Sequence, residues 1–489
     1  MRIVTKLNSK TGRNLLFFSF IMVFLLSCSK SSGPGGGGNV STITAFSFQQ
    51  AGNSTPLASN AVISGTNVNI FLPPGTDTRA LIATYSLSDS ATVLVNGAAQ
   101  QSGVTANDFS SPVIYTVTGL NGKIVTYTVN LTTGISAIDQ NVAAFMTKYN
   151  VPGLSIAITL NERLVYMNSY GKASLEDNQN VTSQSLFRIS SLSKQITSAA
   201  IMRLLDQNKI SLDQKVFGTG GILGTIYGTQ PYGPGITNIT VGQLLHHTEG
   251  GWPDNNTDPL GTNPNMTVQQ IVSWGLNNVP LLDTFPGTSY YYSHFGYSIL
   301  GRVIEQITGM PYTQAVQTLV LQPCGISDMQ VAGNTLADRL PNEVKYYSSN
   351  QYSPYTFNIS RMDAANGWLA SATDLANFLV HVDGLSGKTI LSPGAITTMS
   401  TPSLANPKYA CGWEVNQLNW WHHGNLPGTG TTQAITTQNG NFNYVILTNT
   451  GNDDPNFSSD MDNIFWNAQP NVNLWPNYDL FNAGPAKTL

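Results

Sequence analysis

Hydrophobic and polar positions follow two different patterns along this 489-residue chain. Between residues 42 and 134 apolar side chains recur at every second position, as in NVNIFL, where Val68, Ile70 and Leu72 alternate with polar residues. Such alternation is typical of half-buried β-strands, and the Asn-Gly pair at 121–122 suits a tight hairpin turn. No helical period is visible here, so this segment is predicted to be an all-β, immunoglobulin-like sandwich.

After residue 134 the pattern changes. Residues 138–149 have helical spacing, and two alternating runs then flank a turn at 161–162. Two more runs near the C-terminus flank another turn at 439–440, and helices and loops alternate between these ends. Strands at both ends with helices between them predict an α+β domain over residues 135–489, in which an antiparallel sheet flanked by helices carries an inserted helical subdomain.

The first 28 residues have the pattern of an export signal. A basic segment precedes the apolar run LLFFSFIMVFLL at 15–26, which is short for a membrane span. The run ends in LLSC, which resembles the lipobox of bacterial lipoprotein signal peptides. That resemblance implies a lipid on Cys28 and a membrane-anchored protein of the cell envelope, periplasmic or surface-facing; an ordinary signal peptide or short anchor is the alternative. The Gly- and Ser-rich residues 29–41 would form a flexible linker.

Composition narrows the range of partners. Only 10% of the residues are charged and the net charge is −4. Without a basic stripe, nucleic acid is not expected as a partner. Cys324 and Cys411 read as two small buried residues, although export would permit a disulfide between them.

Residues 187–195, FRISSLSKQ, open an apolar-periodic helix. Ser191 and Lys194 are three positions apart and therefore share one helix face. A capping serine and a solvated lysine are the simplest interpretation. A nearby lysine can instead make a serine nucleophilic, either by removing its proton or by keeping a second base ionised. Because S-x-x-K is common by chance, its meaning depends on companion motifs.

Two companion motifs are present. Tyr292 and His294 stand in a Y-S-H triplet, and HHG at 422–424 precedes Pro427-Gly428. In order and separation the three motifs resemble the S-x-x-K, Y-x-N and K-T-G or H-x-G signatures of the serine β-lactamase and penicillin-binding-protein superfamily. Class C β-lactamases, family VIII-type esterases and D-amino-acid peptidases are the most similar kinds. LLHHTEGGW, ANGWLASATDLANFL and YACGWEV add supporting matches, and the resemblance covers about residues 138–447.

The resemblance implies a role for each matched residue. Ser191 would be the acylated nucleophile, and Lys194 would favour the phenolate of Tyr292, which would act as the base. The backbone N–H groups of Ser191 and Asn425 would form the oxyanion hole. Four residues would bind the substrate in a largely apolar cleft: His294, His422, Gly424 and Trp252.

Departures from the family pattern bear on the substrate. His294 replaces the usual Asn, Glu249 replaces a common Ser, and the loop at 218–235 is long. His422 replaces a lysine that would grip a carboxylate. The sequence therefore predicts a lipid-anchored serine hydrolase that acts through an acyl-enzyme on small esters or D-amino-acid amides and peptides. A β-lactamase or D-alanyl-D-alanine carboxypeptidase, and a catalytically silent surface sensor, remain alternatives.

No cofactor is predicted. Five of the six histidines lie in or beside the matched motifs, and neither H-E-x-x-H nor H-x-H-x-D-H occurs, so a zinc site is not expected. The β-domain has no cluster of chemically active side chains and is predicted to be a spacer or adhesion module, with glycan or surface contact as the alternative.

Overall fold

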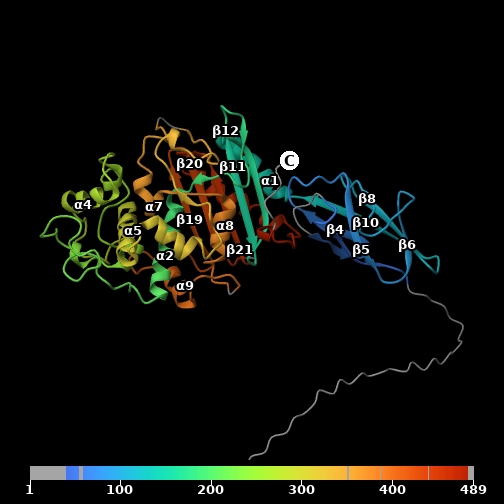
Figure 1. The fold of residues 1–489 in the computed structure, drawn as a ribbon, viewed down its shortest axis with the longest axis horizontal. Coiled ribbons are helices and arrows are strands. Elements are labelled where there is room, and N and C mark those ends of the chain that lie inside the picture. Colours follow the sequence, from blue (N-terminus) through green and yellow to red (C-terminus); the bar gives the residue numbers. More distant parts are fainter. Residues whose placement is uncertain (1–39, 54–58, 350–351, 386, 439, 483–489) are drawn as a thin grey trace, which may run out of the picture. The chain divides into compact units, whose positions relative to one another are not determined.

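A computed structural model of the chain is shown in Figure 1. It describes residues 40–53, 59–349, 352–385, 387–438 and 440–482. The predicted export signal with Cys28, most of the linker, and Asn439 of the C-terminal turn lie outside these residues. Within the described ranges, no helix combines the length and the apolar character needed to cross a membrane.

The N-terminal domain is all-β and consists of two sheets around one core. Their strand orders are β2-β1-β5-β8 and β3-β4-β10-β9-β6-β7. The strands are β1 (Ile43–Phe48), β2 (Ser59–Asn60), β3 (Val62–Ser64), β4 (Asn67–Leu72), β5 (Leu81–Leu87), β6 (Ala91–Val95), β7 (Ala98–Ala99), β8 (Ala106–Asn107), β9 (Val113–Gly119) and β10 (Ile124–Thr133). Val68, Ile70 and Leu72 are buried as their alternation predicts, and β9 and β10 form the expected hairpin.

The second domain is built on a seven-stranded sheet of order β13-β12-β11-β21-β20-β19-β18. Its strands are β11 (Gly153–Leu160), β12 (Arg163–Ser174), β13 (Gln179–Asn180), β18 (Glu414–Val415), β19 (Asn419–Leu426), β20 (Thr429–Thr436) and β21 (Phe442–Thr448). Strand β11, from the start of the domain, pairs antiparallel with β21 from its end. The predicted sheet made from both ends of the domain is therefore confirmed.

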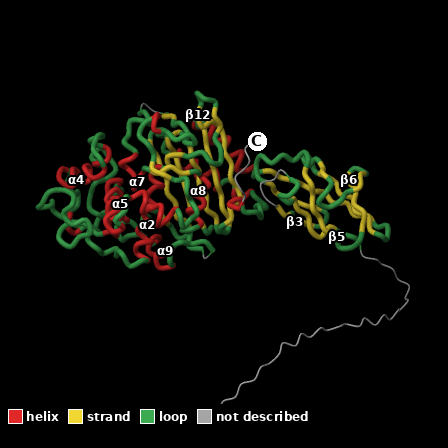
Figure 2. Tube along the Cα trace, in the orientation of Figure 1, coloured by secondary structure: helices red, strands yellow, loops and turns green. Residues whose placement is uncertain are grey.

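Helices cover both faces of this sheet (Figure 2). They are α1 (Ser136–Tyr149), α2 (Ser193–Asp206), α3 (Val241–Leu245), α4 (Val268–Asn278), α5 (His294–Thr308), α6 (Tyr312–Val316), α7 (Asp363–Asn366), α8 (Ala372–Val380), α9 (Pro393–Ser400) and α10 (Phe457–Trp466). Alternating residues of β11 enter different cores: Leu154, Ile156 and Ile158 pack in the core that contains α1 and α10, whereas Ala157 packs in the core that contains α2 and α8. The strand is buried along nearly its whole length because both of its faces are covered.

Helix α2 lies at the centre of the domain. The sequence predicts an amphipathic helix, but nearly every residue from Ser193 to Met202 is buried, because α5, α7 and α9 pack around it. The 3₁₀ helix η1 (Ser190–Leu192) precedes it and contacts β19 at the edge of the sheet. Small pieces complete the fold: strands β14 (Phe187–Arg188), β15 (Gln330–Val331), β16 (Tyr347–Ser348), β17 (Trp368–Ala370) and β22 (Thr450–Gly451). Cys324 and Cys411 are both buried and unpaired.

Candidate active site

Ser191 lies in the turn that joins β14 to α2. The preceding Ser190 has a φ of +51°, and its Oγ donates a hydrogen bond of 3.3 Å to the carbonyl of Asn425 in β19. Gly424 allows this approach, because a Cβ there would lie 2.9 Å from the Ser190 Cβ. Gly424 therefore holds the strand against the turn and is not among the residues that line the cleft. The close packing explains the glycine, and its contact with substrate stays a prediction.

The structure brings the three predicted catalytic side chains together, although more than 90 residues separate Lys194 from Tyr292. The Ser191 Oγ lies 3.1 Å from the Lys194 Nζ and 2.9 Å from the Tyr292 hydroxyl, which donates to it. Ser191 is 6% exposed and Lys194 is fully buried. The serine thus faces the cleft with a nitrogen and a phenol oxygen at hydrogen-bond distance.

Burial disfavours the charged forms of both the lysine and the tyrosine. It lowers the pKa of Lys194 to about 7, against the smaller opposing effects of Asp254 and Asp258. Burial also raises the pKa of Tyr292 well above its usual value, although its hydrogen bond to Ser191 lowers it slightly. Removing both charges from water costs more than their attraction returns at this site. The phenolate expected from the sequence is therefore not the resting form: Tyr292 keeps its proton.

Lys194 is enclosed by hydrogen-bond acceptors. Its Nζ lies 2.9 Å from the Nδ1 of His294, 3.1 Å from the carbonyl oxygen of Ala365 and 3.4 Å from the Oδ1 of Asn366. The Nε2 of His294 lies 3.0 Å from a carboxylate oxygen of Asp254. Burial and the charge of Lys194 lower the pKa of His294, so this imidazole is neutral. His294 therefore contacts the lysine, as the family position of the usual Asn implies.

Asn366 is a site residue that the motif analysis missed. Its Oδ1 accepts a hydrogen bond of 3.1 Å from the Ser191 Oγ. It lies in the quoted segment ANGWLASATDLANFL, but no local pattern marks it as facing the serine. Helix α7, which carries it, packs against α2, and only this packing places the amide beside Ser191.

The cleft in front of Ser191 is polar. Its lining residues are Ser191, Asp254, Tyr290, Tyr292, His294, Asn406, Lys408, Tyr409, Glu414, His422, His423 and Asn425. A second hollow shares Asp254, His294 and Asn425 with it and extends toward Asn452. No tryptophan is among these lining residues, and the apolar surface of the cleft comes from tyrosine rings such as those of Tyr290 and Tyr409.

Trp252 does not reach this cleft. Its side chain is fully buried, its indole N–H donates a hydrogen bond of 2.9 Å to the carbonyl of Val279, and its ring packs edge-on against Phe295. A large aromatic surface with a satisfied N–H is most stable in a core. The predicted substrate contact of Trp252 is corrected to a role in the packing of the helical insert.

His422 lines the cleft with both of its ring nitrogens already bonded. Its Nδ1 lies 2.6 Å from the carbonyl oxygen of His423 and must carry the proton, so its Nε2 accepts from the Tyr409 hydroxyl at 3.2 Å. Burial, with the charge of Lys194, lowers the pKa of His422 to about 3. His422 is thus a neutral wall of the cleft, and it has no free N–H for a substrate carboxylate. Tyr409, which donates to His422, opens the quoted YACGWEV segment.

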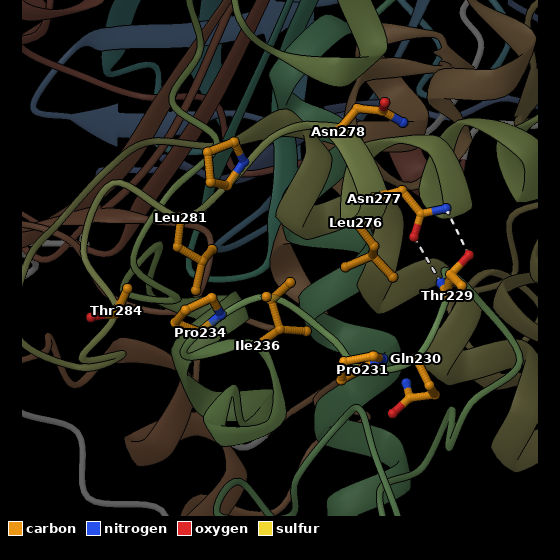
Figure 3. Close-up of a pocket in the computed structure, with 12 residues that line it drawn as sticks. Thr229, Gln230, Pro231, Pro234, Ile236, Leu276, Asn277, Asn278, Leu281 and Thr284 are labelled. Atoms are coloured by element: carbon orange, nitrogen blue, oxygen red, sulfur yellow. Dashed lines mark hydrogen bonds between the residues drawn. The ribbon is translucent and has the colours of Figure 1, made fainter.

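Two other features of the described part of the chain lie near or apart from the Ser191 cleft. Asp254, Asp258 and His294 have ligand atoms within 4.8 Å of one another, but Asp254 and His294 are already bonded to each other. Figure 3 shows a separate hollow in the helical insert, where Asn277 bonds Thr229 and the other lining residues carry no titratable side chain. The reactive groups are concentrated at Ser191.

An α+β domain that brings a serine, a buried lysine and a tyrosine together is typical of serine hydrolases. Comparison with known proteins gives the same class. The family model described as Beta-lactamase matches residues 138–465, which is more than half of the chain. The chain therefore belongs to the β-lactamase family of serine hydrolases. A second model, described as SGBP, N-terminal, matches residues 43–131 of the β-domain.

Individual relatives are distant. Penicillin-binding protein 4* of Bacillus subtilis (strain 168) is 27% identical over 232 residues, which is 46% of this chain and 46% of that protein. The chain thus spans about half the length of that curated relative. The D-amino acid amidase from Ochrobactrum anthropi SV3 has a TM-score of 0.58 at 19% identity, covering 69% of this chain and 99% of its own. EstCE1, a hydrolase with promiscuous acyltransferase activity, has a TM-score of 0.54 at 19% identity, covering 68% and 99%. At these identities the structural likeness establishes the fold.

Proposed function

We propose that this protein is an exported, lipid-anchored serine hydrolase that acts through an acyl-enzyme on small esters or D-amino-acid amides and peptides. The observation that carries the proposal is the placement of the Lys194 Nζ at 3.1 Å and the Tyr292 hydroxyl at 2.9 Å from the Ser191 Oγ. Lys194, whose pKa is lowered to about 7 by burial, accepts the serine proton. Tyr292 keeps its own proton and can pass it to the leaving group.

The position of the oxyanion hole follows from the same geometry. Ser190 bonds the Asn425 carbonyl, so the backbones of the Ser191 turn and of β19 meet beside the nucleophile. The N–H groups of Ser191 and Asn425 would stabilise the charge that develops on the substrate carbonyl oxygen.

The cleft supports esters and amides over β-lactams. Enzymes that require a substrate carboxylate need a cation beside the reacting carbonyl, but His422 is neutral and its nitrogens are occupied. Bonding to His294 lowers the pKa of Asp254, against the effect of burial, so an ionised carboxylate also faces the cleft and repels a second one. Comparing kcat/KM for a p-nitrophenyl ester, a D-amino-acid amide and a chromogenic cephalosporin tests this order. A clear preference for the cephalosporin would contradict it.

The alternative of a β-lactamase or D-alanyl-D-alanine carboxypeptidase has one supporting observation. Lys408 is exposed and is the one lysine or arginine among the residues that line the cleft. If Lys408→Ala lowers kcat/KM for carboxylate-bearing substrates and leaves kcat/KM for neutral esters unchanged, the result supports a β-lactamase or D-alanyl-D-alanine carboxypeptidase. A silent sensor would not be labelled at Ser191 by an activated phosphonate.

Anchoring is proposed from the sequence of residues 1–28, which end in the lipobox-like LLSC. Cys28→Ser should move the protein from the membrane fraction to the soluble fraction of the cell envelope. The β-domain would then hold the enzyme away from the lipid or contact glycans or another surface. Retention of the isolated domain on immobilised polysaccharides would favour the contact role.

A further inference from the structure

A chain of hydrogen bonds reaches Lys194 from the edge of the cleft. The Asp254 carboxylate lies 3.0 Å from the His294 Nε2, and the His294 Nδ1 lies 2.9 Å from the Lys194 Nζ. The backbone N–H of Asp254 donates a hydrogen bond of 2.8 Å to the carbonyl of Tyr292. The loop that carries Asp254 is therefore fastened to the segment that carries the site tyrosine, and the carboxylate is held in place.

The bond to Asp254 decides which nitrogen of His294 carries the proton. A carboxylate only accepts hydrogen bonds, and a neutral imidazole has a single N–H. The proton must therefore lie on Nε2, facing Asp254. This leaves a lone pair on Nδ1, so His294 can only accept a hydrogen bond from Lys194.

The consequence for Lys194 follows from its own donors. In the protonated lysine, three N–H groups can be donated to the His294 Nδ1 at 2.9 Å, the Ala365 carbonyl at 3.1 Å and the Ser191 Oγ at 3.1 Å. The Asn366 Oδ1, at 3.4 Å, already accepts from the Ser191 hydroxyl. A neutral amine has two N–H groups and one lone pair, so if His294 and Ala365 take the two N–H groups, the lone pair faces Ser191. With the opposite imidazole tautomer, the Nδ1–H would donate to that lone pair and occupy it.

We propose that Asp254 is a positioning residue that keeps His294 an obligate acceptor, so that the lone pair of Lys194 is reserved for the Ser191 hydroxyl. The inference rests on the proposed acylation of Ser191. In that step the hydroxyl proton, which Asn366 accepts at rest, turns to the Lys194 Nζ and is transferred to it. The Oγ electron pair forms the bond to the substrate carbonyl carbon while the carbonyl π pair moves onto the oxygen. When that pair returns, the bond to the leaving group breaks; Tyr292 protonates the leaving group and takes a proton from Lys194 in return. Asp254 and His294 neither gain nor lose a proton.

This arrangement replaces one residue of the family pattern by two. An asparagine at the His294 position would offer a carbonyl oxygen as the acceptor once its amide is oriented by its neighbours, and it would need no particular tautomer. A histidine offers an acceptor only in one tautomer. Asp254 fixes the tautomer of His294, so that the histidine accepts a hydrogen bond from Lys194 as the oxygen of an asparagine would.

Several other groups face Lys194 or His294 and can affect how the labelling rate depends on pH. They are Ser191, His247, Tyr292, Tyr297, His422, and the carboxylates Asp254 and Asp258. Both carboxylates raise the pKa of Lys194. Asp258 makes a matched control, because it lies in the same loop and its described hydrogen bond goes to the backbone of Leu260 rather than to His294.

The test is a double-mutant cycle read by the rate of Ser191 labelling with an activated fluorophosphonate. Asp254→Asn should lower the plateau labelling rate about tenfold or more, because an amide can also donate to His294 and permit the wrong tautomer. The double variant, Asp254→Asn with His294→Asn, should be labelled at the same rate as His294→Asn alone. Asp258→Asn should keep the wild-type plateau, although the loss of its charge also lowers the pKa of Lys194. The proposal would be overturned if Asp254→Asn lowered the labelling rate by the same factor in the wild-type protein and in His294→Asn.

The pH profile separates positioning from a general loss of structure. Because the Asp254 charge raises the pKa of Lys194, its removal should move the rise of labelling to lower pH while the plateau falls. A lower plateau with an unmoved profile would contradict the inference. If the wild-type protein is not labelled, or Ser191→Ala is labelled equally, the proposed function itself has failed, which is a distinguishable result.

Discussion

The two domains bury different kinds of side chain. In the β-domain the described polar residues that are buried are Ser41, Ser47 and Ser59, and its core is otherwise apolar. The hydrolase domain buries several ionisable groups among the described residues, including Arg188, Lys194, Glu249, Arg302 and Asp363. Burying a charge costs several kcal/mol unless partners compensate it. A buried ionisable side chain is therefore expected either to have an oppositely charged partner or to serve a function.

Within the hydrolase domain the buried groups are again of two kinds. Arg302 bonds Asp363 at 2.7 Å and Glu305 at 2.7 Å, so its charge is matched. No described carboxylate lies within salt-bridge distance of Lys194, which burial drives toward its neutral form. A matched buried pair supports the fold, whereas an unmatched buried lysine beside a serine supports chemistry. The predictions below test this difference.

The largest effect is expected at the nucleophile. Ser191→Ala should lower turnover by about 10⁶-fold, as the loss of a nucleophile does in other serine enzymes. Ser193→Ala is the control, because the Ser193 Oγ accepts a hydrogen bond from the Trp368 backbone and lies outside the cleft. Turnover of the best ester measures both. If Ser193→Ala or Ser190→Ala is the inactive variant, the assigned nucleophile is wrong.

Loss of either proton-transfer group should have the next largest effect. Lys194→Ala and Tyr292→Phe should each lower kcat by about 10²- to 10⁴-fold with folding preserved. A lysine that acts as a base must be neutral, so kcat/KM in the wild-type protein should rise with pH through about 7. Near-normal turnover in Tyr292→Phe would leave Lys194 as the sole proton carrier.

Replacing the two buried cations, Arg302 and Lys194, by apolar residues should change the free energy of unfolding in opposite directions. Arg302→Leu leaves Asp363 unpaired and should lower the free energy of unfolding by about 3–5 kcal/mol. Lys194→Met should raise it at pH 7 by about 2–4 kcal/mol, because the unfolded state gains a proton that the folded state holds weakly. This gain should shrink as the pH rises from 7 toward the unfolded pKa of about 10.4. Urea unfolding at several pH values measures both, and a destabilised Lys194→Met would contradict the assignment.

The smallest effect is expected from removing the β-domain. A chain that begins near Ser136 should keep kcat/KM on soluble substrates, because the described residues of the β-domain do not line the Ser191 cleft. The full-length protein without its lipid, Cys28→Ser, is the control. A loss of activity with an unchanged circular dichroism spectrum would show that the β-domain acts on catalysis.

Local pattern alone determined much of this protein. The turn at Asn161-Glu162, where both residues have positive φ, and the alternation in β4 and β11 required only neighbouring residues. The motifs around Ser191 and Tyr292 could be recognised because spacing along one segment fixes which side chains share a face. The fold class was therefore accessible from the sequence, and Ser191 stays the predicted nucleophile.

Tertiary structure decided how the site works. Asn366 reaches Lys194, and Asp254 reaches His294, only because a helix and a loop far along the chain pack against α2 and the Tyr292 segment. Trp252 turned out to be core, since its motif does not say which way the ring points. The charge of Lys194 and Tyr292 depends on how completely water is excluded, which no spacing encodes. Proximity in space and local dielectric are properties of the packed domain, and they made a neutral pair where the motif suggested an ionised one.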